Sequence, residues 1–460
     1  MNIVHLITIV QKTLKMKKIF LTLFLFRVIG AYSQTSLDTY IKTALSNNES
    51  IKQQQFLLTK SLYALKEAKS LFLPSVAFNG AYTIADGGRT VDIPIGDLLN
   101  PVYKTLNQMT GTNNFPQVQN QNVLLNPNNF YDAKIRTTYP ILNAEIEYNR
   151  KIKTQQYDLQ KIEINLYQRE LVKEVKNAYY KYLQACEAVN IYQTALSLVK
   201  ENLRVNTSLF NNQKVNRTAV LRSDNEVSKY NALLESSIQT QNNAKAYFNF
   251  LLNTDLNTGI ITDSIITIPV DLFLTDTSVA KREELEKLKE AIAINKNITS
   301  LAKSYKRPKL NAFADLGSQA FDFKVNNKSF YYLAGISVEW NIFSGNKNKY
   351  KIQQAEADGK VLQSQTSYVE QQLKLQLTIS NNSFKAALAQ YNAAQSQVAS
   401  SQKYYNDMFR MYKEGQALFI ELLDAQNQLV TAKLQLNISL FDTWIKATEI
   451  ERANASFIIQ

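Results

Sequence analysis

The chain has 460 residues and a formal net charge of +13, with 12 glycines and 8 prolines. This scarcity of turn residues favours long helices over a loop-rich α/β architecture. One cysteine, Cys186, and one histidine, His5, exclude an intramolecular disulfide and a His/Cys zinc site, and no catalytic residue, cofactor or metal site is expected. The basic residues form no run interleaved with aromatic residues, so nucleic-acid binding is not predicted.

Residues 1–33 have the pattern of a secretory signal peptide, for which the alternative interpretation is a short buried helix. The pattern comprises a charged start, an apolar stretch and a cleavage site flanked by small residues: Lys17 and Lys18, Ile19–Phe26, and Ala31-Tyr32-Ser33. Met16 stands where such peptides begin, so it is an alternative start of the chain. Cleavage would remove His5, and with it any histidine-based catalytic triad.

Residues 34–253 are predicted to form a first structural repeat of helix, β-hairpin and long helical hairpin. The first helix is expected over residues 36–71, before Pro74. Two strands with alternating side chains follow: Val76, Phe78, Gly80 and Tyr82 in one, and Ala133, Ile135, Thr137, Tyr139 and Ile141 in the other. Residues 84–130 between them are rich in Asn, Gln, Gly and Pro and are predicted to be a long loop.

Each hairpin precedes a predicted helix of unusual length, over residues 143–210 and 344–411. In the first of these helices, apolar residues at 4-3 spacing indicate a coiled-coil seam: Leu171, Val175, Ala178, Tyr182, Ala185, Val189, Tyr192, Leu196, Val199 and Leu203. At 1.5 Å per residue, each helix would extend roughly 100 Å. Short turns at 211–213 and 413–415 lead into return helices, and no compact globular domain needs such lengths.

The second half, residues 284–460, repeats this plan after a connecting element at 254–283. Residues at a constant offset correspond between the two long helices: Val175, Tyr182, Val189, Leu196, Leu203 and Phe210 to Leu377, Phe384, Tyr391, Val398, Tyr405 and Tyr412. The second hairpin is expected to contain strands around Leu310–Leu316 and Tyr332–Ile342. A repeat of this size is too long for a solenoid, so it predicts two pseudo-equivalent halves.

Four predicted strands cannot close a barrel within one chain. Two isolated hairpins would leave exposed edges, whereas a barrel assembled from several chains removes them. Such a barrel also satisfies the requirement that strands crossing lipid form a closed structure. The alternative is a pair of hairpins packed on the helices of a soluble protein.

Several short motifs occur in an order that resembles the TolC family of outer-membrane export channels: Leu73-Pro74-Ser75-Val76, Trp340–Gly345, Tyr412-Lys413-Glu414-Gly415 and Leu422-Leu423-Asp424-Ala425-Gln426. The resemblance covers essentially the whole chain after residue 33. It implies a mainly α fold with β-strands, in which a homotrimer shares a coiled-coil helical barrel and a transmembrane β-barrel with four strands per protomer.

The resemblance also implies a function and a location. The chain would be the exit duct of a tripartite efflux or export system in the outer membrane of a Gram-negative bacterium, with its helices in the periplasm. Its partners would be outer-membrane lipid, a periplasmic adaptor protein and an inner-membrane transporter. The alternatives are a duct for type I protein secretion and a coiled-coil structural or adhesive surface protein. No enzyme activity is expected.

The acidic constriction of the family maps onto Glu421 and Asp424. At positions i and i+3 they share one helix face, so threefold symmetry would aim a ring of carboxylates at a narrow lumen. Like charges so placed repel one another and attract cations. The alternative is an ordinary pair of solvated acids.

The family's residues at the closed periplasmic tip map less completely. Its tip arginine and tip acid correspond here to Ala417 and Ala219. We therefore expect Arg222 to pair with Glu421 or Asp424 when the tip is closed. Two further residues are expected at the tip. Tyr412 is expected to pack there, or alternatively to fill the helix seam. Gly415 is expected to supply a turn conformation that other residues adopt with difficulty.

Overall fold

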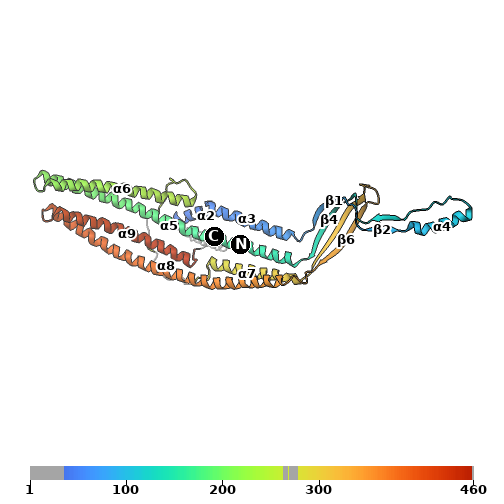
Figure 1. The fold of residues 1–460 in the computed structure, drawn as a ribbon. Helices are drawn as coiled ribbons and strands as arrows, with labels where there is room; N and C mark the ends of the chain where they lie inside the picture. Colours follow the sequence, from blue (N-terminus) through green and yellow to red (C-terminus); the bar gives the residue numbers. More distant parts are fainter. Residues whose placement is uncertain (1–35, 263–267, 269–277, 458–460) are drawn as a thin grey trace, which may run out of the picture. The chain divides into compact units, whose positions relative to one another are not determined.

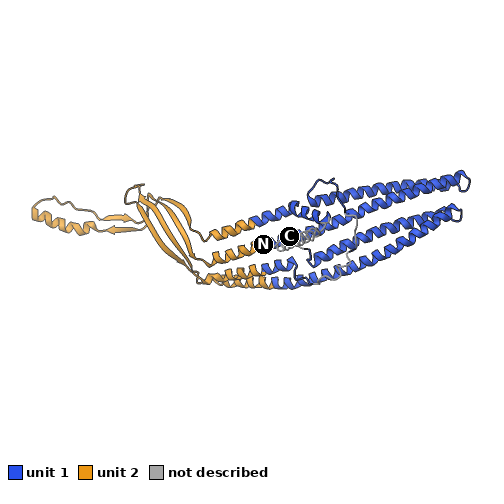
Figure 2. Ribbon diagram, turned by 180° about the vertical axis from the view of Figure 1, so that it is seen from behind, with its two compact units in different colours: residues 1–59, 158–291, 362–460 blue, residues 60–157, 292–361 orange. Residues whose placement is uncertain are grey.

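The computed structural model describes residues 36–262, 268 and 278–457 (Figure 1). The expected signal peptide at 1–33 and much of the connecting element at 254–283 lie outside the described residues. The chain divides into two compact units, and several of the long helices contribute a part to each (Figure 2). Unit 1 comprises residues 1–59, 158–291 and 362–460, and unit 2 comprises residues 60–157 and 292–361.

The elements follow one another in the order helix, hairpin, helical hairpin, twice over. Their bounds are α2 Ser36–Asn47, α3 Glu49–Ser70, β1 Ser75–Thr83, β2 Thr90–Ile93, α4 Ile95–Thr110, β3 Gln121–Leu124, β4 Phe130–Leu142, α5 Ala144–Asn211, α6 Arg217–Leu252, α7 Glu283–Lys303, a 3-10 turn Ser304–Lys306, β5 Lys309–Phe321, β6 Phe330–Glu339, α8 Lys347–Lys413 and α9 Phe419–Ala453. In the described part of the chain, no helix is both long and apolar enough to cross a membrane.

The helices of unit 1 pack through the apolar seam that the 4-3 spacing predicts. In its central part, Leu196 and Val199 of α5 are buried and share a core with Tyr230 of α6 and Val430 of α9. Toward the turns, Tyr405 of α8 joins a core that includes Leu422 of α9. The α5–α6 hairpin therefore lies beside the α8–α9 hairpin, with α9 in contact with both long helices (Figure 1).

The first helix is divided into two, contrary to the single helix predicted over 36–71. Asn48 interrupts it, and its side-chain Oδ1 accepts hydrogen bonds from the backbone N–H groups of Ser50 (2.9 Å) and Ile51 (3.3 Å). Asparagine satisfies in this way the free N–H groups at the start of α3. Asn48 Nδ2 also donates to the Leu251 carbonyl oxygen at 3.3 Å, which fastens the break to the end of α6.

Unit 2 is built on an antiparallel sheet with strand order β1-β4-β5-β6. Both edge strands, β1 and β6, have one unpaired side within the described residues. One face carries rows of apolar side chains in register, of which one row crosses all four strands: Phe78, Ile135, Leu316 and Tyr332. The other face carries charged side chains. The alternation predicted from the sequence is thus present, and the sheet has one apolar and one polar face.

Residues 84–130 are not the loop that their composition predicts. They contain the short ribbon β2–β3 and helix α4, which project beyond the end of the main sheet that lies away from the strand-to-helix junctions (Figures 1 and 2). The apolar residues of α4 recur at helical spacing: Ile95, Leu98, Val102, Leu106 and Met109. The surrounding Asn, Gly and Pro residues mask this periodicity in the sequence. Gly111 then ends the helix in the left-handed conformation, with φ of 61°.

Candidate functional site

The turns of the two helical hairpins adopt the same backbone conformation. Gln213 in the α5–α6 turn has φ of 60°, and Gly415 in the α8–α9 turn has φ of 75°. In both turns the following residue donates its N–H to a carbonyl five residues earlier: Lys214 to Leu209 and Gln416 to Met411, each at 2.9 Å. The sequence predicted a need for glycine at Gly415 alone, but Gln213 adopts the left-handed conformation as well, at a steric cost.

This shared geometry gives a matched pair of substitutions. We expect Gln213→Gly to leave stability unchanged or raise it slightly, and Gly415→Gln to lower it by about 1 kcal/mol, because only the latter introduces left-handed strain. No atom outside the turn lies within 4 Å of a Cβ at Gly415, so the effect is conformational rather than steric. Thermal unfolding of both variants measures it. Equal destabilisation by the two substitutions would contradict the explanation.

The predicted acidic pair lies on the exposed face of α9. Glu421 and Asp424 are exposed, while Leu422 and Ala425 beside them are fully buried. Glu421 Oε2 accepts the N–H of Leu418 at 2.7 Å, which caps the start of the helix. Asp424 Oδ2 accepts a hydrogen bond from Gln428 Nε2 at 2.7 Å. Both carboxylates are therefore held in place on a surface that the protomer itself does not cover.

Arg222 is exposed on α6. Among the described residues of one protomer, no ion pair joins it to Glu421 or Asp424. The pairing expected from the sequence is thus not made within the protomer, and it stays a prediction for contacts between protomers.

Tyr412 belongs to a buried polar network that joins three helices. Its ring is almost fully buried and packs on Phe419, with ring centroids 5.6 Å apart. Its hydroxyl donates to Asn206 Oδ1 of α5, and Asn206 Nδ2 donates to Ser223 Oγ of α6. Ser223 Oγ in turn donates to the Ala219 carbonyl oxygen at 2.9 Å. Burial raises the pKa of Tyr412, so its hydroxyl stays protonated and remains a donor.

A second buried pair lies one turn earlier in α5, on the side away from the α5–α6 turn. Asn202 Nδ2 donates to Gln426 Oε1 at 2.5 Å, and both side chains are almost completely buried. Sequence reasoning missed these amides, although a signal existed: Asn202 and Asn206 continue the apolar seam at helical spacing. Polar residues at such positions fix the register of helices at a cost in stability. Gln426 of the predicted motif is therefore a packing residue that orients α9 against α5.

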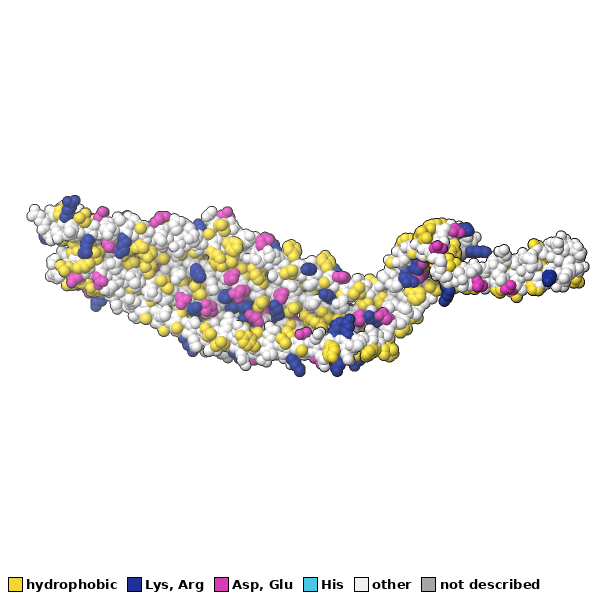
Figure 3. Space-filling view, in the orientation of Figure 1, with side chains coloured by type: hydrophobic (Ala, Val, Ile, Leu, Met, Phe, Trp, Pro, Cys, Tyr) yellow, Lys and Arg dark blue, Asp and Glu magenta, His cyan; other side chains and the backbone are white. Residues whose placement is uncertain are grey.

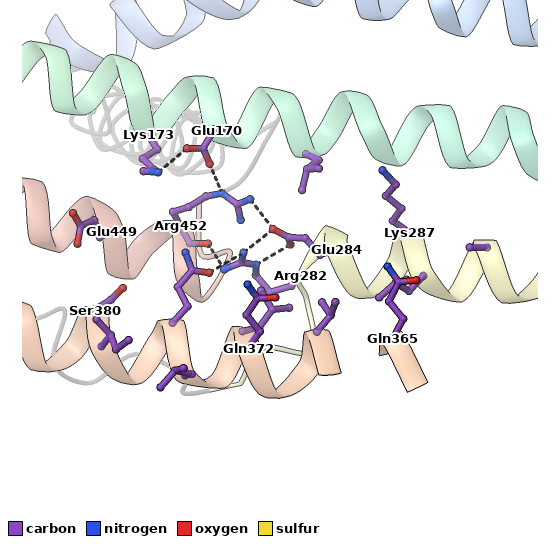
Figure 4. A pocket seen from close by; sticks show the side chains of 18 of the residues that line it. Glu170, Lys173, Arg282, Glu284, Lys287, Gln365, Gln372, Ser380, Glu449 and Arg452 are labelled. Atoms are coloured by element: carbon purple, nitrogen blue, oxygen red, sulfur yellow. Dashed lines mark hydrogen bonds and ion pairs between the residues drawn. The ribbon is translucent and has the colours of Figure 1, made fainter. Parts of the chain in front are cut away.

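A charged groove of about 1000 Å³ lies between α5, α7, α8 and α9 in unit 1 (Figure 4). At its base, Arg452 Nη2 lies 2.8 Å from Glu284 Oε1, and Arg452 Nε lies 3.1 Å from Glu170 Oε2. Arg282 Nη2 approaches Glu284 Oε1 to 2.6 Å. Arg282 Nη1 also donates to the carbonyl oxygens of Arg452 and Ala453, at 3.2 and 3.0 Å, and so caps the end of α9.

This cluster changes the ionisation of Glu284. Burial by itself would raise the pKa of the carboxyl group, but the hydrogen bonds from Arg282 and the positive charges of Arg452 and Arg282 lower the pKa to about 2. The carboxylate therefore stays charged at neutral pH. The cluster joins α5, α7 and α9, which identifies it as a structural anchor for the chain on either side of the connecting element.

The polar face of the sheet in unit 2 carries its own ion pairs. Arg136 Nη2 lies 2.6 Å from Asp315 Oδ2, and Lys134 Nζ lies 2.6 Å from Asp132 Oδ2. Tyr331 of β6 donates its hydroxyl hydrogen to Asp132 Oδ1 at 2.8 Å. Hydrophobic side chains (yellow) and charged side chains (blue and magenta) both reach the surface over this sheet in Figure 3. The strand register places Arg136 and Asp315 on the face opposite the apolar row that contains Ile135 and Leu316.

The sequence matches a known family over part of its length. Residues 287–439 match the model of the outer membrane efflux protein family. No curated protein sequence matches the chain. The matched segment contains β5, β6, α8 and most of α9, including Glu421 and Asp424.

Solved outer-membrane channels have the same fold. VceC from Vibrio cholerae is 13% identical, with a TM-score of 0.72 over 91% of this chain and 95% of that chain. CmeC from Campylobacter jejuni is 14% identical, with a TM-score of 0.71 over 91% and 85%. The open state of MtrE from Neisseria gonorrhoeae is 15% identical, with a TM-score of 0.68 over 91% and 88%. This chain therefore has the fold of the TolC family of outer-membrane channels, and its residues 287–439 are similar to the outer membrane efflux protein family.

Proposed function

We propose that the chain is the outer-membrane exit duct of a tripartite efflux system, formed by three copies. The observation that carries the proposal is the apolar row across the sheet. Phe78, Ile135, Leu316 and Tyr332 are 73%, 50%, 65% and 83% exposed in the protomer. Adjacent apolar side chains of this size require a cover, and the hydrocarbon of a bilayer provides it.

The two free sheet edges support closure by copies of the same chain. An open edge cannot lie in lipid, because its N–H and C=O groups would lack hydrogen-bond partners. Pairing β6 of one protomer with β1 of the next removes both edges and leaves the charged face, with Arg136 and Asp315, toward the lumen. The structural relatives that share this fold are outer-membrane channels, which agrees with this assembly.

The partners that we propose are a periplasmic adaptor protein and an inner-membrane transporter. The hairpin turns at Gln213 and Gly415 are short and exposed at the ends of the helical hairpins. Such turns are suited to binding an adaptor, because their sequence can change to fit a partner without disturbing the hydrophobic core. In this arrangement the cargo is chosen by the transporter, and the chain supplies the passage.

The test is conductance in planar lipid bilayers. The purified protein is expected to form detergent-stable trimers that insert into bilayers and give discrete single-channel currents. Soluble elongated dimers without currents would contradict the proposal and would favour a coiled-coil surface protein instead.

The role of Arg222 in closing the tip has its own test. We propose that Arg222 pairs with Glu421 or Asp424 of a neighbouring protomer in the closed state. Arg222→Ala is then expected to raise single-channel conductance or the fraction of time spent open, because a charged link at the narrow end is lost. Arg217→Ala, another exposed arginine of α6, is the matched control. Unchanged conductance and closing in Arg222→Ala would refute the role.

A further inference from the structure

Residues 84–129, which contain β2, α4 and β3, form an ordered arm on the sheet of unit 2. A segment returning from α4 runs along the helix and is held by two asparagines. Asn100 exchanges hydrogen bonds with the backbone of Val118 at 2.8 and 2.9 Å. Asn107 does the same with Phe115, at 2.8 and 3.1 Å. One face of α4 is therefore covered by its own chain.

The base of the arm is fixed to the main sheet. Tyr82 donates its hydroxyl hydrogen to Asn129 Oδ1 at 2.6 Å, and Asn129 Nδ2 donates to Asp322 Oδ1 at 2.6 Å. The Tyr82 ring also stacks on Phe323, with centroids 4.9 Å apart. These contacts tie the arm to the turn between β5 and β6, so the arm has a defined starting point on the sheet.

The opposite face of α4 is apolar and is not covered by any of the described residues. Leu98, Val102 and Met109 are 68%, 53% and 79% exposed and lie along one stripe of the helix. In the ribbon, Val91 and Val123 are direct cross-strand neighbours and are also exposed. A two-stranded ribbon is only marginally stable by itself. Covering this surface would therefore stabilise the arm.

The charges of the arm disfavour a lipid surface as the cover. Its charged residues are three acids and two bases: Asp86, Asp92, Asp97, Arg89 and Lys104. Helices that lie on a membrane surface usually carry many basic residues on the polar face, and this arm has a small acidic excess. The arm is close to neutral, so identical arms would not repel one another strongly.

The position of the arm indicates a second copy of the chain as its occupant. The arm continues from Thr83, the last residue of β1, and β1 is a free edge. Closing the sheet through its edges, on which this inference rests, brings one arm from each protomer to the same end of the barrel. Three copies of a short apolar stripe can associate when the shared barrel holds them close together, because this raises their effective concentration.

We propose that the three α4 helices of a trimer pack against one another through Leu98, Val102 and Met109, and form a collar at the mouth of the channel. Residues three, four or seven positions apart lie on one face of a helix, and helices that pack side by side use such faces. The collar is a protein–protein contact beyond the membrane-facing part of the barrel, and it is formed by residues that the barrel itself does not require.

Cysteine cross-linking in intact outer membranes tests the collar. In a Cys186→Ala chain, Val102→Cys and Met109→Cys are expected to give disulfide-linked dimers on mild oxidation. Lys104→Cys and Gln108→Cys, on the exposed polar face of the same helix, are the matched controls and should remain monomeric on denaturing gels. Absence of the stripe cross-links, or equal cross-linking from both faces, would overturn the proposal.

A second variant separates the collar from the channel itself. Adding Leu98→Asp to the Met109→Cys chain is expected to abolish the cross-link, since it places a charge in the stripe, whereas Lys104→Asp should leave it intact. The number of chains per particle is counted in the same sample. If the particle contains three chains but the stripe cysteines do not cross-link, the collar is refuted and the proposed function is not. If the unmodified protein does not form a trimer, the proposed function itself is refuted.

Discussion

Replacing Arg452 by methionine is expected to lower the free energy of unfolding by about 2–3 kcal/mol. The Arg452 side chain is 8% exposed and is the shared partner of Glu284 and Glu170. Removing Arg452 takes away positive charge that offsets the cost of burying these two carboxylates. Each carboxylate then pays more of its desolvation cost in the folded state. Arg282 still holds Glu284, and Lys173 still holds Glu170, whose side chain is 41% exposed, so the loss is smaller than for a fully buried charge without a partner.

The matched control is Arg204→Met. Arg204 makes a similar two-atom contact with Glu201, at 2.7 and 2.8 Å, but its side chain is 69% exposed. An ion pair at such a site contributes about 0–1 kcal/mol. Thermal or denaturant unfolding followed by circular dichroism measures both variants. Equal stability of the two would contradict an anchoring role for the groove cluster.

The same cluster predicts a dependence on pH. The pKa of Glu284 is lowered from 4.5 to about 2 in the folded state, so its interactions contribute stability above the unfolded-state pKa. That contribution is lost as the pH falls from about 4.5 toward 2. Glu284→Gln should therefore destabilise the protein at neutral pH, and the difference from the unmodified protein should shrink in this window. Glu286→Gln, at an exposed site, is the control.

Neutralising the acidic pair is expected to reduce the preference of the channel for cations. In the proposed trimer, Glu421 and Asp424 of three protomers surround the narrow end. One charge interaction at close range in water amounts to about 1 kcal/mol, so the cation-to-anion permeability ratio should fall roughly fivefold in Glu421→Gln/Asp424→Asn. Reversal potentials in a salt gradient measure this ratio.

The design of this variant keeps the helix intact. A glutamine at 421 can still accept the N–H of Leu418, and both substituted side chains lie on the exposed face. Glu370→Gln, an exposed acid elsewhere on α8, serves as the control. An unchanged permeability ratio in the double variant would show that the pair is an ordinary solvated one, which is the alternative left open by the sequence.

The parts of the fold that the sequence predicted are those with a long, regular pattern. The 4-3 spacing from Leu171 to Leu203 predicted α5, and period-two alternation around Ile135 and Ile336 predicted the strands. These patterns repeat often enough to outweigh individual polar residues. The wrong predictions involve short elements: Asn48 divides the first helix, and α4 lies within a stretch dominated by loop-forming residues.

The candidate sites were predictable to a smaller degree. Tyr412 and Gly415 could be placed at the α8–α9 turn by motif, but their contacts depend on tertiary structure. Tyr412 reaches Asn206 from another helix, and no local pattern marks that pairing. The same is true of the groove, where Arg452 meets Glu170 and Glu284 from distant segments. Contacts between protomers, such as the one proposed for Arg222, are harder still to predict from the sequence, because they also depend on how the copies assemble.

Counting the chains in the purified, detergent-solubilised protein by native mass spectrometry tests the central claim most directly. Among the described residues, the sheet has free edges at β1 and β6 and an exposed apolar face, so it is incomplete by itself. Three protomers would complete it as a closed barrel. We predict a particle of three chains that persists in mild detergent. A stable single chain, or a dimer, would contradict the account.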